Sequence, residues 1–165
     1  MTPRVAFGRL GEANAERLRR MYPGARGNAT ARRYARVWAW AFGKGLIPGR
    51  WVTLEVPGRT SGKATRFPLG IMDVDGRSYL GSMLGNTCNW VRNVCANNGY
   101  AVIEHRGRRQ VHLVEIPPTE RPPLLKAFLE QVPGSRPHIP LTMDRPVEDF
   151  EAIAADYPIF RIDSV

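Results

Sequence analysis

The feature that most restricts the fold is a change of periodicity near Arg50. After this point apolar and polar residues alternate, beginning with Val52, Leu54 and Val56. A period of two places successive side chains on opposite faces of the backbone, so the run predicts a half-buried strand. Further alternating runs follow, and turn signals such as Asp75-Gly76 separate them. The second part of the chain is therefore predicted to consist mainly of hairpins.

Six runs are expected to form strands and five segments to form helices. The strands are expected at 50–56, 65–73, 78–82, 100–105, 109–116 and 158–162. The helices are expected at 9–22, 30–42, 90–96, 124–132 and 147–156. This order predicts an α+β fold built on a small, mainly antiparallel barrel with flanking helices. Pro68 cannot donate to a strand ladder, so we expect an edge or a bulge there.

The whole chain is expected to form one domain, because it has 165 residues of which 43% are apolar. Residues 1–49 would form an N-terminal helical extension and residues 50–165 the barrel core. We find neither an apolar run of about 18 residues nor the pattern of a secretory signal. Cys88 and Cys95 would lie about 10 Å apart along a helix, too far for a disulfide. We therefore expect reduced thiols and a cytoplasmic protein.

The net charge of +9 favours an anionic partner: a phosphorylated small molecule, nucleic acid or an acidic membrane surface. A surface for single-stranded nucleic acid would interleave several exposed aromatic residues with basic ones on the strands. Only Trp51 and Phe67 fit that pattern, so we do not expect nucleic acid to bind.

Flexible backbone and positive charge are concentrated between the first two predicted strands, in the segment 58–69. Glycine allows the backbone to approach a ligand closely, and consecutive N–H groups in a turn form a concavity that attracts anions. Arg59, Lys63 and Arg66 would surround this concavity with charge, which predicts a phosphate site. A hairpin turn with solvated basic residues explains the same spacing.

The predicted helix 30–42 combines aromatic and basic side chains. Trp38 and Trp40 lie among Arg32, Arg33 and Arg36. Such a helix can rest on an anionic membrane or cover one side of a ligand pocket. It can equally be a core helix whose arginines are solvated.

Three motifs occur in a recognisable order. They are G-R-x-S-G-x-x-x-R-x-P-L at 58–69, N-W-V-R-N-V-x-A at 89–96 and Y-P-I-F-R at 157–161. In this order and with these separations, the sequence resembles the deazaflavin-dependent nitroreductase family from about residue 51 to 162. The resemblance implies a split β-barrel that uses coenzyme F420. The chain departs from better-known members at Thr60, where they often have Lys or Arg, and at Leu84, where they often have glycine.

The resemblance also implies a set of cofactor contacts. The basic turn would hold the phosphate and anionic tail, the strand ending in Ser82 and the loop after it would lie along the deazaflavin ring, and the helix with Trp90 and Asn93 would lie beside the cofactor. The implied cofactor-binding residues are Arg59, Thr60, Ser61, Gly62, Lys63, Arg66, Pro68, Ser82, Met83, Leu84, Gly85, Trp90 and Asn93.

The activity implied is hydride transfer from reduced F420 to a small organic acceptor, such as a quinone, a nitroaromatic or an activated alkene. The acceptor gains negative charge on oxygen, so a nearby hydroxyl or imidazole donor would help. The candidates, in order, are Ser82, Tyr157 and His138. Their structural interpretations are a strand-end hydrogen bond, a core aromatic residue and a surface loop residue, respectively.

Several alternatives stay open or are set aside. The barrel can bind FMN instead of F420, or carry an anionic lipid or fatty acid without turnover near a membrane. Monomer and homodimer are both compatible with the sequence. His105 and His112 lack a third ligand at metal spacing, so we expect no metal site. Cys88 and Cys95 lack an adjacent base and are not expected to be nucleophiles.

Overall fold

The computed structural model describes residues 16, 20, 29–44, 46 and 50–165. The helix expected at 9–22 lies outside these residues except for Glu16 and Arg20, which are helical and form an ion pair at 2.6 Å.

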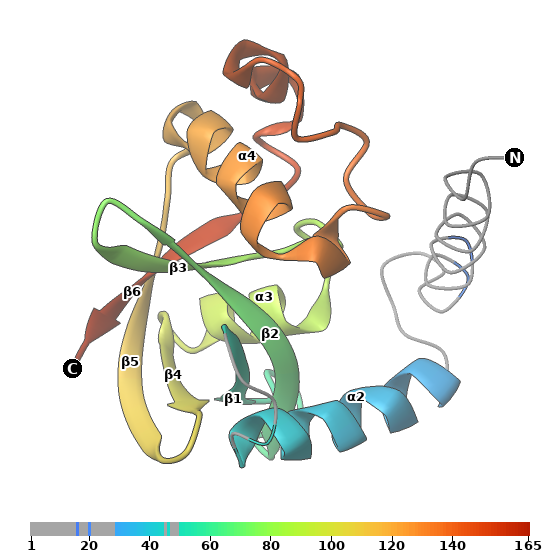
Figure 1. Ribbon diagram of the computed structural model, residues 1–165. Helices are drawn as coiled ribbons and strands as arrows, with labels where there is room; N and C mark the ends of the chain where they lie inside the picture. Colours follow the sequence, from blue (N-terminus) through green and yellow to red (C-terminus); the bar gives the residue numbers. More distant parts are fainter. Residues whose placement is uncertain (1–15, 17–19, 21–28, 45, 47–49) are drawn as a thin grey trace, which may run out of the picture.

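Six antiparallel strands form a closed barrel in the order β1-β2-β3-β6-β5-β4 (Figure 1). The strands are β1 (Trp51–Pro57), β2 (Ala64–Val74), β3 (Arg77–Gly81), β4 (Tyr100–Glu104), β5 (Arg108–Glu115) and β6 (Ile159–Ser164). The predicted fold class is confirmed, and each strand lies close to its expected position. At Pro68, β2 pairs only with β1, because its pairing with β3 begins at Ile71. The expected edge at Pro68 is therefore present.

Three α-helices are described besides the strands: α2 (Ala29–Gly43), α3 (Asn89–Ala96) and α4 (Arg121–Gln131). Short 3₁₀ segments are η2 (Pro118–Glu120), η3 (Pro133–Ser135) and η4 (Val147–Ile153). The helix expected at 147–156 is present in a shorter form, as the 3₁₀ helix η4. Its ends close by bonds three residues apart, from the N–H of Asp149 to Pro146 and from that of Ala154 to Glu151.

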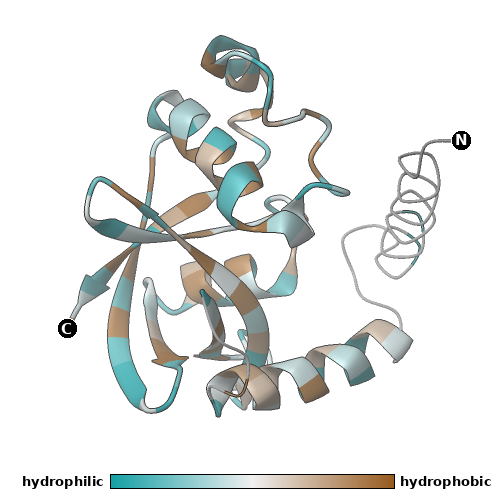
Figure 2. Ribbon diagram, in the orientation of Figure 1, coloured by the Kyte–Doolittle hydropathy of each residue, from teal (hydrophilic) through white to brown (hydrophobic). Residues whose placement is uncertain are grey.

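Two apolar clusters stabilise the fold. The first fills the barrel with residues such as Leu54, Leu80 and Phe160, and α3 adds Trp90 and Val94 to it. The second lies between the sheet and α4 and includes Met72, Leu125, Phe128, Phe150 and Ile159. Figure 2 shows the brown and teal bands that alternate along the strands, as expected when one strand face is buried.

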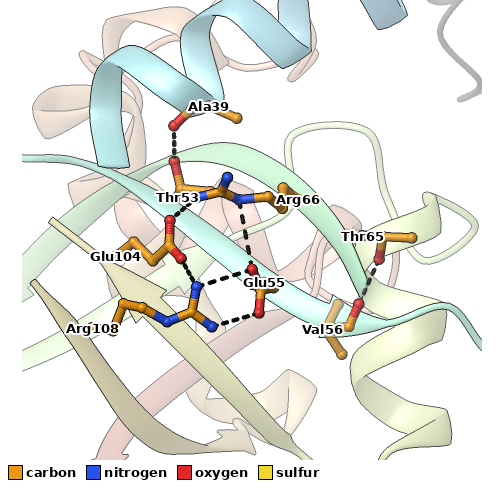
Figure 3. Close-up of polar contacts among 8 residues, drawn as sticks. All are labelled: Ala39, Thr53, Glu55, Val56, Thr65, Arg66, Glu104 and Arg108. Carbon is orange, nitrogen blue, oxygen red and sulfur yellow. Dashed lines mark hydrogen bonds and ion pairs between the residues drawn. The ribbon is translucent and has the colours of Figure 1, made fainter. Parts of the chain in front are cut away.

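Helix α2 lies against β1 and β2, away from α4 (Figure 1). It packs through small side chains, since Ala31 and Ala39 are almost fully buried. Its C-terminal half is held to β1, because the Thr53 hydroxyl donates to the Ala39 carbonyl (Figure 3). The Phe42 ring also stacks on Trp51 with centroids 5.2 Å apart. Among the described residues, no helix combines the length and hydropathy needed to span a bilayer.

Candidate functional site

Two cavities meet beneath α2. One has a volume of about 190 Å³ and mainly apolar walls, and the other has a volume of about 770 Å³ and basic walls. Arg32, Ala35, Phe67 and Asn89 line both of them. We call the two together the α2 cleft. The cleft therefore offers an apolar chamber and a charged chamber side by side under one helix.

The apolar chamber is built from aromatic side chains and close-packed glycines. Trp51, Phe67, Trp90 and Phe128 are among its walls, together with Pro68, Leu69, Met83, Leu84 and Cys88. A Cβ at Gly81 would meet the Phe128 ring at 3.0 Å, and one at Gly70 would meet Val132 at 2.8 Å. These glycines allow α4 and the segment after it to approach the sheet closely, which narrows the chamber.

The turn 58–63 forms one side of the charged chamber. The Gly58 N–H donates to the Lys63 carbonyl at 2.8 Å, and the Gly62 N–H donates to the Gly58 carbonyl at 2.7 Å. Gly62 has φ of +66°, a conformation that glycine adopts without strain. Within the described part of the chain, the N–H groups of Thr60 and Ser61 have no acceptor. The predicted concavity therefore offers these two donors to a ligand.

Asn93 fixes this turn to α3. Its Oδ1 accepts from the Arg59 N–H at 3.3 Å and from Arg59 Nη1 at 2.9 Å, while its Nδ2 donates to Thr65 Oγ1 at 3.2 Å. The Thr65 hydroxyl donates in turn to the Val56 carbonyl at 2.6 Å. Asn93 is almost fully buried, and one N–H of its amide remains for a further acceptor.

The positive charge of the chamber differs from the sequence expectation. Arg59 lines the chamber, and its guanidinium bonds only to the neutral amide oxygens of Asn93 and Asn89 among the described residues, none of which neutralises its charge. Lys63 is not among the residues that line it. Two arginines of α2, Arg32 and Arg36, line it instead. The sequence signal that places these arginines is the alanine series at 31, 35 and 39, which marks the packed face of the helix.

Arg66 lines the same chamber but belongs to a four-residue charge network, shown in Figure 3. Its guanidinium pairs with Glu104 and lies 3.6 Å from a Glu55 oxygen. Arg108 joins the same two carboxylates, at 2.7 Å to Glu55. Two cations thus balance two anions, and Glu104 is 5% exposed. Arg66 therefore contributes less net charge to the chamber than Arg59 does.

The loop after β3 divides between two environments. Met83 and Leu84 line the apolar chamber, and they also line a neighbouring hollow of about 360 Å³ with Gly85. Ser82 is 1% exposed and lines neither cavity. Its hydroxyl donates to the Gly85 carbonyl at 2.8 Å and lies 3.1 Å from Cys88 Sγ. This placement favours the structural interpretation of Ser82, a strand-end hydrogen bond.

Tyr157 and His138 both line the hollow beside Met83 and Leu84. The Tyr157 hydroxyl donates to the His138 carbonyl at 3.2 Å. Partial burial raises the pKa of this phenol above its usual value, and the Asp156 carboxylate adds to the rise. The group therefore keeps its proton at neutral pH and can act as a donor.

The two thiols are free and differ in access. Cys88 is buried in the wall of the apolar chamber, and burial raises its pKa although hydrogen bonding with Ser82 opposes the rise. Cys95 is exposed, and its pKa is raised by desolvation and by the Glu115 carboxylate. No metal-binding group of three or more His, Cys, Asp or Glu side chains occurs in the described residues.

The barrel is similar to several solved structures at low identity. One, a domain-swapped dimer, is 18% identical with a TM-score of 0.50, over 80% of this chain and 95% of that chain. A protein of unknown function from Agrobacterium tumefaciens is 14% identical with a TM-score of 0.51, over 80% of this chain and 54% of that chain. An F420-H2-dependent reductase, FDR-A, is 19% identical with a TM-score of 0.47, over 71% of this chain and 96% of that chain. At these identities, the first two show the fold alone. No protein-family model and no curated protein matches the sequence.

The thiols provide a test of the chamber wall. In the native protein, N-ethylmaleimide should label Cys95 before Cys88, with Cys88 at least about tenfold slower, because Cys88 is 3% exposed. Both rates should rise with pH, since a raised pKa leaves little thiolate at neutral pH. Peptide mass spectrometry measures both rates, and Cys95→Ser isolates Cys88. Equal native rates for the two thiols would contradict this placement.

Proposed function

We propose that this protein is an oxidoreductase that holds coenzyme F420 in the α2 cleft and transfers hydride from it to a small organic acceptor. One observation carries the proposal: the apolar chamber and the larger basic chamber are neighbours that share four lining residues, Arg32, Ala35, Phe67 and Asn89. A planar ring joined to an anionic tail has the same two-part character. The order of the three sequence motifs supports the same cofactor class.

The residues present fit such a cofactor. The aromatic walls of the apolar chamber, among them Trp90 beside Leu84, offer flat apolar surface to a ring. Arg59 and the free N–H groups of Thr60 and Ser61 suit a phosphate, and Arg36 adds charge from the opposite wall. When bound, the deazaflavin supplies the hydride.

The chain itself would orient the ring, exclude water and supply a proton. Helix α2 lines both chambers, so it would shield the reacting face of the cofactor ring from solvent. The acceptor would lie in the hollow across Met83 and Leu84, where the Tyr157 hydroxyl would exchange its bond to the His138 carbonyl for one to an oxygen that gains charge. His138 borders the same hollow, whereas Ser82 would act by holding the loop through Gly85. The acceptor class remains a quinone, a nitroaromatic or an activated alkene.

Replacing Arg59 should weaken cofactor binding more than replacing Lys63. Arg59→Gln is expected to raise the Kd for F420 about tenfold or more, because a charge-assisted bond contributes about 1.5–3 kcal/mol. Lys63→Gln is the matched control, since Lys63 does not line the charged chamber. Titration with the quenching of tryptophan fluorescence measures both, because Trp51 and Trp90 line the apolar chamber.

The same titration separates the rival ligands. FMN and a fatty acid are titrated in parallel with F420 into the unmodified protein. If FMN binds more tightly than F420, the proposed cofactor is a flavin and not a deazaflavin. If the fatty acid binds more tightly than F420, the result favours a lipid carrier without turnover. If Arg59→Gln and Lys63→Gln have equal effects on F420, the assigned position of the anionic tail is wrong.

Filling the roof of the cleft should block the cofactor. Ala35→Leu places a larger side chain where α2 lines both chambers, so F420 binding should fall at least about tenfold while the protein stays folded. Val37→Leu is the control, because Val37 is 65% exposed on the outward face of α2. Calorimetry measures binding, and circular dichroism checks folding. Full affinity in Ala35→Leu would place the ligand outside the cleft.

We also propose that the outward face of α2 rests on an anionic membrane surface. Arg33, Val37, Trp40 and Lys44 follow one another at spacings of four, three and four residues, which places them on one side of the helix. Val37 and Trp40 are 65% and 56% exposed, with Trp40 at the border between this face and the charged chamber, which it also lines, and α2 contains no acidic residue. Trp38, whose ring packs on Phe42 at 5.5 Å, is less exposed. The basic and aromatic face is complementary to an acidic interface.

Vesicle sedimentation tests this contact. Vesicles containing phosphatidylglycerol should bind the protein, vesicles of phosphatidylcholine alone should not, and Trp40→Ser should weaken binding roughly fivefold or more. Tyr100→Ser is the matched control, because Tyr100 is 52% exposed and belongs to β4 and not to α2. Equal binding by the two variants, or no dependence on anionic lipid, would contradict the proposal.

A further inference from the structure

A separate cavity of about 480 Å³ lies where β1, β2 and β3 face the β4–β5 hairpin. Its lining residues are Arg50, Val52, Ile71, Asp73, Ser78, Ile103, His105, Gly107, Arg108 and Arg109. None of them lines either chamber of the α2 cleft. The proposed redox function therefore leaves this cavity without a role. We call it the barrel-end cavity.

Strand register places Arg109 on the inner side of the barrel. Arg109 lies opposite Ile103 in the β4–β5 pair, and Ile103 lies opposite Leu54 in the β4–β1 pair. Residues directly opposite one another in an antiparallel pair project to the same face. Because Ile103 and Leu54 are 2% and 0% exposed inside the barrel, the Arg109 side chain leaves β5 on that inner face.

The charge around the cavity is not balanced. Arg108 is occupied by Glu55 and Glu104, and Arg50 lies 3.0 Å from Asp73 Oδ2. Asp73 is the one acidic residue of the lining, and its other oxygen accepts from the Ser78 hydroxyl at 2.6 Å. Throughout the residues that the structure describes, the Arg109 side chain has no hydrogen-bond or ion-pair partner. The lining thus carries three guanidinium groups and one carboxylate, and one of the three guanidinium groups, that of Arg109, is unpaired.

The rest of the lining supplies an apolar floor. Val52, Ile71 and Ile103 are branched aliphatic residues of the barrel interior. His105 donates through Nδ1 to the Trp51 carbonyl at 2.9 Å, because a carbonyl can only accept, and this leaves Nε2 for another partner. Sites for small molecules combine such apolar walls with a few converging polar groups.

We propose that the barrel-end cavity binds a small amphipathic organic anion, with its charged group at Arg109 and Arg50 and its apolar part on the aliphatic floor. A guanidinium recognises a carboxylate with paired N–H donors, which suits this arrangement. The site is independent of the proposed cofactor cleft, so either assignment can fail without the other.

Octanoate is a suitable probe, followed by the backbone amide signals of the ¹⁵N-labelled full chain. Octanoate should shift the signals of Val52, Ile71, Ile103 and Arg109, and Arg109→Gln should weaken binding about tenfold. Arg92→Gln is the matched control, because Arg92 is exposed on α3 and does not line this cavity. Octanamide, which lacks the charge, should bind at least about tenfold more weakly than octanoate.

Three outcomes would overturn the proposal: shifts confined to the α2 cleft, equal affinity in Arg109→Gln and the unmodified protein, or equal affinity for octanamide and octanoate. F420 binding by Arg109→Gln is measured alongside and should be unchanged. A loss of F420 affinity would show that the two sites are not independent and would also contradict the proposal.

Discussion

The buried carboxamide of Asn93 is the interaction on which the cleft depends most. It is the point where the basic turn, the second strand and α3 meet, since Oδ1 holds Arg59 and Nδ2 holds Thr65. A carboxylate at position 93 could still accept from Arg59 but could not donate to Thr65. An alkyl side chain there would lose the hydrogen bonds to both Arg59 and Thr65. The amide satisfies a donor and an acceptor at once without adding charge. Arg59 can therefore stay positioned while its charge remains available to an anion.

The charge network beneath α2 has the opposite effect. Glu55 and Glu104 pair with Arg66 and Arg108, so the Glu104 carboxylate, at 5% exposure, faces two guanidinium groups. The same network packs against Gly43, where an added Cβ would lie 3.0 Å from a Glu104 oxygen. It therefore stabilises the end of α2 rather than the ligand. The positive potential of the cleft comes from residues without such carboxylate partners, of which Arg59 is the clearest example.

The barrel strands could be predicted from the sequence because a period of two and short turns are local signals. The strand at Val52 and the turn at Asp75 can be identified without knowledge of distant residues. The lining of the cleft is not local. Lys63 and Arg59 look equivalent in the sequence, yet the turn directs only Arg59 toward α3 and Asn93. The sequence left open whether the helix with Arg32 and Arg36 covers a ligand pocket, rests on a membrane or has solvated arginines, because the packing partner of α2 is set by tertiary contacts. The burial of Ser82 depends likewise on the loop that follows it, which no periodicity encodes.

Helix α2 connects these observations. The side of α2 that faces the barrel carries small side chains, because alanine recurs there. These side chains do not fill the space between α2 and the barrel, so two cavities remain. Two contacts, from Thr53 to Ala39 and from Phe42 to Trp51, hold the C-terminal half of α2 to β1. The part of the helix that covers the apolar chamber is its N-terminal half, at Ala31, Arg32 and Ala35. Because Ala31 in this half and Ala39 in the other are 1% and 2% exposed, both halves of α2 are packed, and the cover of the apolar chamber is part of the packed structure.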